Sequence, residues 1–104
     1  MSNFAKFGTL TANGNTDAVS VNLLATLSAT TSGGTPGSLA WQFKGANGVW
    51  TPIMKDDGTT PMAGGAAMQY TKWFGDDVAV RGVLTGSTGA TWVWQIMSNP
   101  QNNG

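Results

Sequence analysis

The feature that most constrains the fold is a two-residue spacing of apolar side chains over residues 17–27. The apolar positions are Val19, Val21, Leu23, Ala25 and Leu27. Polar residues lie between them, for example Ser20 and Thr26. Because successive side chains of a β-strand point to opposite faces, this spacing predicts a strand with one buried face and one solvent-facing face. No segment shows the 3.6-residue period of a helix.

Similar short strands are predicted along the rest of the chain, at 4–11, 39–44, 49–54, 68–74, 78–85 and 90–97. About seven short strands with turn residues between them are typical of an all-β, antiparallel β-sandwich of the jelly-roll or immunoglobulin-like kind. The chain reads as a single domain over 1–104. We expect an N-terminal arm at about residues 1–8 and a loose polar tail at about 98–104.

The segments between the strands carry strong turn signals. Asn47-Gly48 predicts a hairpin between 39–44 and 49–54, and Asp76-Asp77 predicts a turn before 78–85. Residues 29–38 (ATTSGGTPGS) predict a long flexible loop, because Gly and Pro resist regular structure. This loop is long enough to reach a neighbouring molecule.

Charge and cysteine content limit the functions that the chain can have. Five Lys or Arg balance five Asp, and charged residues are only 10% of the chain, against roughly 25% in an average domain. No basic field is available for phosphates, so nucleic acid is not an expected partner. Without cysteine there is neither a disulfide nor a thiolate metal site. No signal peptide or membrane-spanning run is recognised, so we expect no membrane partner.

Catalysis is not expected, because the chain has no His or Cys and its carboxylates occur mainly as Asp56-Asp57 and Asp76-Asp77. Neighbouring carboxylates on a strand point to opposite faces, so turn formation is the preferred interpretation of both pairs. A glycoside hydrolase remains an alternative if Asp56 and Asp76 or Asp77 converge within about 10 Å. Residues 13–17 and 56–58 are oxygen-rich like calcium loops but lack the closing Glu. We therefore expect no catalytic residue, cofactor or metal.

Tryptophan is unusually frequent in this sequence, at positions 41, 50, 73, 92 and 94. Trp41 shares a strand face with Leu39 and Phe43, which predicts a core position. Trp92 and Trp94 fill one face of their strand while Val93 puts apolar bulk on the other. Either one molecule buries both faces, or one face forms a subunit interface or a sugar-stacking surface. Trp50 and Trp73 lie beside turns and are expected to be the exposed rings.

Two segments carry a resemblance to a known family. Residues 37–53 contain a strand, the Asn47-Gly48 turn and Trp50-Thr51-Pro52, and residues 77–96 contain a Val80-Arg81 strand, a Gly-rich turn and a final strand. This order resembles the small β-sandwich proteins of tailed-phage virions. The turn departs from the family pattern by lacking an Asp between Asn and Gly, and the N-terminal third matches no recognised pattern.

The resemblance implies a structural virion protein of the head decoration or cement type, made in the host cytoplasm and placed on the capsid surface. Its partners would be the major capsid protein and itself, as a homodimer or homotrimer. The arm at 2–7 and the loop at 30–37 are the expected contact elements. The expected contact residues are Phe4, Phe7, Thr30, Thr35, Pro36, Trp50, Trp73, Trp92 and Trp94.

A carbohydrate-binding or tail-adhesin module is the main alternative from another class. It would use Trp50, Trp73 and a tryptophan on a strand face as a stacking surface for sugar rings. Asn, Gln and Asp would then bond the sugar hydroxyls.

Overall fold

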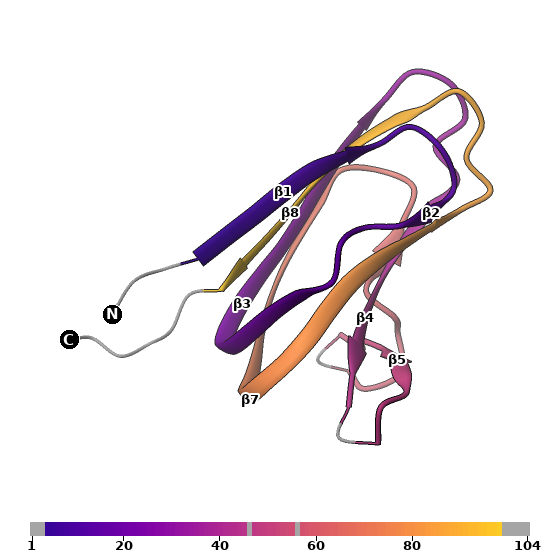
Figure 1. The fold of residues 1–104 in the computed structure, drawn as a ribbon. Helices are drawn as coiled ribbons and strands as arrows, with labels where there is room; N and C mark the ends of the chain where they lie inside the picture. Colours follow the sequence, from indigo (N-terminus) through magenta and orange to yellow (C-terminus); the bar gives the residue numbers. More distant parts are fainter. Residues whose placement is uncertain (1–3, 46, 56, 99–104) are drawn as a thin grey trace.

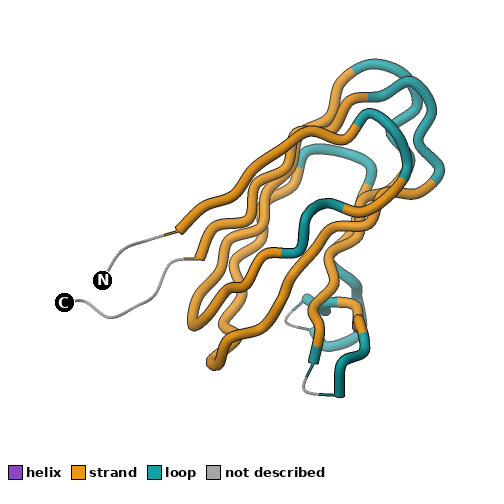
Figure 2. The backbone as a smooth tube through the Cα atoms, viewed as in Figure 1, coloured by secondary structure: helices purple, strands orange, loops and turns teal. Residues whose placement is uncertain are grey.

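The computed structural model describes residues 4–45, 47–55 and 57–98, and these residues form strands and turns without a helix (Figures 1 and 2). The strands are β1 (Phe4–Leu10), β2 (Gly14–Asn15), β3 (Val19–Ser32), β4 (Ser38–Lys44), β5 (Trp50–Pro52), β6 (Ala63–Gly64), β7 (Met68–Thr85) and β8 (Thr91–Ser98). All pairs between these strands are antiparallel. The predicted all-β antiparallel fold is confirmed. Within this described part there is also no helix that could span a membrane.

Two long, bent strands, β3 and β7, join the two layers of the sandwich (Figure 1). The hydrogen-bonded order is β1-β8-β3-β7-β4-β5, with β2 on β7 and β6 on β4. The first layer contains β1, β8, the later part of β3 and the early part of β7. The second contains the start of β3, the end of β7, and β2, β4, β5 and β6. β3 and β7 therefore each contribute residues to both layers of the sandwich.

The bend in β7 lies where two separate strands and a turn were predicted. Val21 pairs with Val78 and Leu24 with Trp73, so β7 carries more residues than β3 over this interval. Extra residues in one strand form a β-bulge, which bends the strand and increases its twist. Gly75 in the bulge has φ 83°, a conformation that favours glycine. The predicted turn at Asp76-Asp77 is thus wrong: the chain continues through it as one strand of 18 residues.

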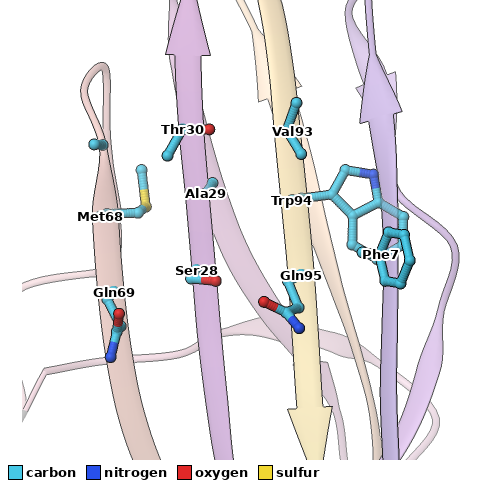
Figure 3. Close-up of a pocket in the computed structure, with 10 residues that line it drawn as sticks. Phe7, Ser28, Ala29, Thr30, Met68, Gln69, Val93, Trp94 and Gln95 are labelled. Atoms are coloured by element: carbon cyan, nitrogen blue, oxygen red, sulfur yellow. The ribbon is translucent and has the colours of Figure 1, made fainter.

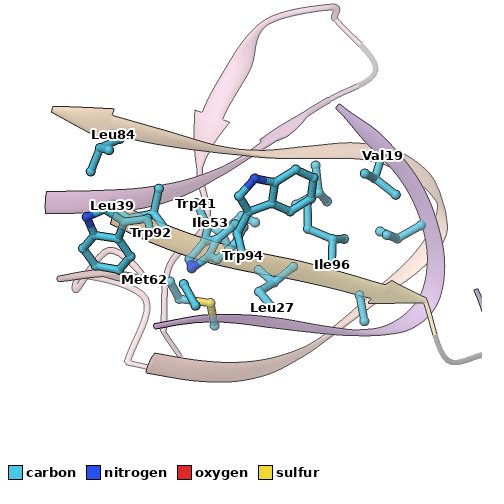
Figure 4. Packing of buried hydrophobic residues seen from close by; sticks show 14 residues of the cluster. Val19, Leu27, Leu39, Trp41, Ile53, Met62, Leu84, Trp92, Trp94 and Ile96 are labelled. Atoms are coloured by element: carbon cyan, nitrogen blue, oxygen red, sulfur yellow. The ribbon is translucent and has the colours of Figure 1, made fainter. Parts of the chain in front are cut away.

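The core lies between the layers and contains three of the five tryptophans (Figure 4). Trp41, Trp92 and Trp94 are at most 3% exposed. The alternating face of β3 is buried at Val19, Val21, Ala25 and Leu27, which confirms the prediction at these positions, and it continues at Ala29. The side chain of Leu23 lies outside the described part.

Trp92 and Trp94 were expected to contact a partner, and this expectation is corrected for both. Their side of β8 faces the core together with Ile96. The indole Nε1 of Trp92 donates to the carbonyl oxygen of Pro36 at 2.9 Å. Because both rings are covered by their own chain, neither offers a surface to another molecule.

The predicted loop at 29–38 is shorter and more firmly held than expected. Residues 29–32 belong to β3, and the backbone of Thr35 exchanges two hydrogen bonds of 2.8 Å with Thr88. A Cβ atom on Gly34 would lie 2.3 Å from the carbonyl oxygen of Thr88, so the two turns meet backbone to backbone. Thr35 remains exposed and Pro36 is half-buried. The loop is a packed part of one end of the sandwich.

The two chain ends differ in part from the predicted arm and tail. Residues 4–8 of the expected arm belong to β1, which pairs with β8 along its whole length from Phe4 to Leu10. Backbone pairing with β8 holds them in the first layer. Ser98 likewise closes β8. Residues 1–3 and 99–104 lie outside the described residues.

Candidate functional site

The outward side of the first layer is the most unusual surface of the molecule. Strand register places fifteen residues on this surface, which we call the outer face: Ala5, Phe7, Thr9, Leu24, Thr26, Ser28, Thr30, Ser32, Gln69, Thr71, Trp73, Thr91, Val93, Gln95 and Met97. None of them is charged. A solvated sheet face normally carries charged side chains, so this surface differs from an ordinary solvent-facing one.

Large apolar side chains are exposed on the outer face. Phe7 is 72% exposed, Trp73 56% and Val93 48%. Figure 3 shows Phe7 on β1 beside the side chains of β8, and Val93 of β8 beside Thr30 of β3. A shallow hollow crosses these strands and is lined by Phe7, Val93, Thr30 and their neighbours. Phe7 and Val93 line this hollow, whereas Trp73 lines a separate hollow with Phe43 and Pro52 of the second layer. Exposed apolar side chains on an uncharged surface are typical of places where another molecule binds.

Short polar side chains occupy most of the remaining outer face. Thr26 and Thr71 face each other across β3 and β7, and their hydroxyl oxygens lie 3.3 Å apart. Ser28 lies between Gln95 and Gln69 in one row across the layer. Short hydroxyl side chains lose little conformational entropy on burial and offer both donors and acceptors. The face is therefore suited to a flat, uncharged contact with another protein.

The outward side of the second layer has a different chemistry. The guanidinium carbon of Arg81 lies 4.2 Å from the ring centroid of Trp50, and Nζ of Lys44 lies 5.9 Å from it. Arg81 Nε also donates to Oε1 of Gln42 at 3.0 Å. These cation–π contacts cover the indole. Trp50 is half-buried as a result, so the expectation that it is one of the exposed rings is wrong.

The carboxylate of Asp57 is used to build a turn. The backbone N–H groups of Thr59 and Thr60 both donate to Oδ1 at 2.9 Å, and the Thr60 hydroxyl donates to Oδ2 at 2.6 Å. The Thr60 hydroxyl, followed by the two backbone amides, lowers the pKa of Asp57 to about 2. The interpretation of this aspartate as a turn former is therefore confirmed.

The residues of the hydrolase alternative are only partly described. Asp56 and the side chain of Asp76 lie outside the described residues. Asp57 is held ionised by its turn, which makes it a poor proton donor for a leaving group. In the described part of the chain no group of three or more His, Cys, Asp or Glu side chains gathers in one place.

The structure brings three of the predicted contact residues onto one surface. Phe7, Thr30 and Trp73 all lie on the outer face. Thr35 and Pro36 lie at the end of the sandwich, and the side chain of Phe4 is outside the described part.

Sequence reasoning did not place Val93 among the contact residues, although the alternation of the last strand already set it opposite Trp92 and Trp94. It also missed Arg81 and Lys44 around Trp50. Comparisons of the chain with protein-family models, curated proteins and solved structures find no match.

Proposed function

We propose that the protein is a non-enzymatic structural component of a tailed-phage virion, a decoration or cement protein that binds the outer surface of the capsid. The uncharged outer face, with Phe7, Trp73 and Val93 exposed, is the observation that carries this proposal. Its partners are the major capsid protein and further copies of itself, as a homodimer or homotrimer. The virion, at the capsid surface, is its proposed location.

The mechanism would be the burial of uncharged surface across the junctions between capsid subunits. Specific interfaces bury about 1,200 to 2,000 Å² in total, and each apolar side chain removed from water contributes to binding. Because none of the outer-face residues is charged, no charge of this face has to be desolvated on binding. Many copies on one lattice then add their contributions, so each contact can be individually modest.

Binding to empty capsids of the phage that encodes the chain tests this function. Val93→Asp places a carboxylate in the middle of the outer face and is expected to raise the Kd for the capsid at least about tenfold. Val49→Asp is the matched control, because Val49 is 56% exposed and lies in the β4–β5 hairpin of the other layer. Co-sedimentation measures both variants. Wild-type protein that does not sediment with capsids contradicts the function.

Trp73 keeps the carbohydrate-binding or tail-adhesin alternative open. Its ring is 56% exposed, and Gln69 and Thr71 lie on the same face of β7. A sugar ring stacked on this indole would change its fluorescence. Titration of the wild type and of Trp73→Phe with a panel of glycans tests the alternative. A saturable change in the wild type that is lost in Trp73→Phe favours it over capsid decoration.

A further inference from the structure

β1 is a long strand at the edge of the first layer. All seven of its residues pair with β8, and no strand of the described part pairs with its other side. Alternate backbone N–H and C=O groups of β1 therefore face away from the sheet. Such a row of unpaired groups is a template for another strand.

Several other sheet edges carry the protections that proteins use against strand pairing. β2, β5 and β6 are only two or three residues long. The free side of the early part of β7 is bridged by Lys72, whose Nζ donates to the carbonyl oxygen of Met54 at 3.5 Å. Short strands and inward-pointing charges both oppose edge pairing.

β1 is longer than these edges and carries one such protection. It contains no proline, and Lys6 is its one charged residue. Register places Lys6 opposite Ile96, on the face of β1 away from Phe7, and its Nζ lies 3.5 Å from the Asp17 carboxylate of the same molecule. A strand that pairs with β1 therefore meets a single lysine, whose charge is partnered by Asp17.

The residue order of β1 is compatible with itself when the strand is reversed. A two-fold axis through Phe7 sets Phe7 against its copy, Lys6 against Gly8 and Ala5 against Thr9, in each case across the two chains. No like charges are directly opposed, and an aromatic pair directly across two antiparallel strands is stabilising.

Gly8, the residue set against Lys6 of the other copy, adds no side chain to this pairing. A Cβ atom on Gly8 would lie 2.9 Å from the Trp94 ring, so the indole beneath β1 favours a residue without a side chain there.

We propose that β1 pairs antiparallel with β1 of a second copy about a two-fold axis at Phe7, which joins two first layers into one continuous sheet. The contact is isologous and closes after two copies, so it makes a dimer. This proposal rests on the self-association in the proposed function and is independent of capsid binding. It also aligns the two outer faces side by side, so one dimer would present both to the same partner.

Charge variants of Phe7 test the dimer in solution. Phe7 is highly exposed, so its replacement leaves the core intact. Phe7→Asp opposes two carboxylates across the axis and is expected to raise the dimer Kd at least about tenfold, measured by sedimentation equilibrium. Phe7→Lys alone has the same effect, and an equimolar mixture of the two variants recovers a dimer. Val49→Asp is the control and retains the wild-type Kd.

Disulfide trapping tests the register, because the chain has no cysteine of its own. Phe7→Cys is expected to form a covalent dimer on mild oxidation, since this position faces its own copy. Ala5→Cys and Thr9→Cys are each expected to cross-link poorly alone and efficiently when mixed.

Three results would overturn the proposal: a wild type that stays monomeric at every concentration, a wild-type trimer, or equal cross-linking by all three single variants. Capsid binding by a monomeric wild type would reject the dimer and leave the decoration function standing. A wild-type dimer that does not bind capsids would support the dimer and contradict the decoration function.

Discussion

Thr60 donates two hydrogen bonds to the Asp57 carboxylate, one from its hydroxyl and one from its backbone, and Thr59 adds a third. The sequence predicted this use of an aspartate because Asp side chains in turns accept hydrogen bonds from the backbone two residues further on. The same bonds favour the ionised carboxylate, so local geometry and charge state are linked at one residue. The protonated form loses the turn's best acceptor.

The turn at Asp57 should respond to acid in a defined window. Its folded pKa of about 2 lies below the ordinary value of 3.8, so its stabilising contribution is complete above about pH 4 and is lost as the pH falls through 2. NMR titration should place the carboxyl midpoint near 2, with coupled shifts of the Thr59 and Thr60 amides. Asp57→Asn keeps an acceptor and should abolish this pH dependence. A midpoint at or above the ordinary value would contradict the geometry of the turn.

At the scale of elements, β3 was predicted correctly as far as Leu27, and both halves of β7 were predicted as strands, but the continuity of β7 through Gly75-Asp76-Asp77 was not. The two-residue spacing of apolar side chains predicts the buried face of β3 without knowledge of the strands that pair with it. In β7 the residues Gly75-Asp76-Asp77 have turn composition, but pairing with β3 on both sides of them carries the strand through as a bulge. Whether such a segment forms a turn or a bulge depends on pairing with a distant strand, which cannot be predicted from the local sequence.

Gly75 should be necessary for the bulge. Its φ of 83° disfavours a residue with a side chain, so Gly75→Ala should lower the free energy of unfolding by about 1–2 kcal/mol. Gly64→Ala is the matched control, because a Cβ there meets only Met68 Cε at 3.8 Å, an ordinary contact. Urea denaturation measures both variants. Equal stabilities of the two variants would show that the bulge does not depend on this backbone conformation.

For the whole molecule, the outer face illustrates what a sequence can and cannot predict. Phe7, Thr30 and Trp73 were each recognised from their own segments. Their common surface arises only when β1, β8, β3 and β7 align in one register, and β1 and β8 come from opposite ends of the chain. The absence of charge on that surface follows from the same register. Composition indicated few charges but could not locate where they are missing.

One core serves both layers, so we expect the molecule to unfold as a unit. Trp41 of β4 is 1% exposed and lies in the same buried cluster as Leu27 and Trp94 of the first layer. Its indole Nε1 lies 3.2 Å from Sδ of Met68, in the early part of β7. A side chain that touches both layers makes the stability of each depend on the other.

Trp41→Ala should therefore destabilise both layers together. The loss is expected to be about 3–5 kcal/mol, a large share of the 5–15 kcal/mol that stabilises an ordinary domain. Trp41→Phe keeps most of the ring volume and should cost clearly less. Urea curves from far-UV circular dichroism and from the fluorescence of the remaining tryptophans should coincide in the wild type and in both variants. Separate transitions would show that the layers fold independently, and Trp41 would then stabilise only the layer that contains β4.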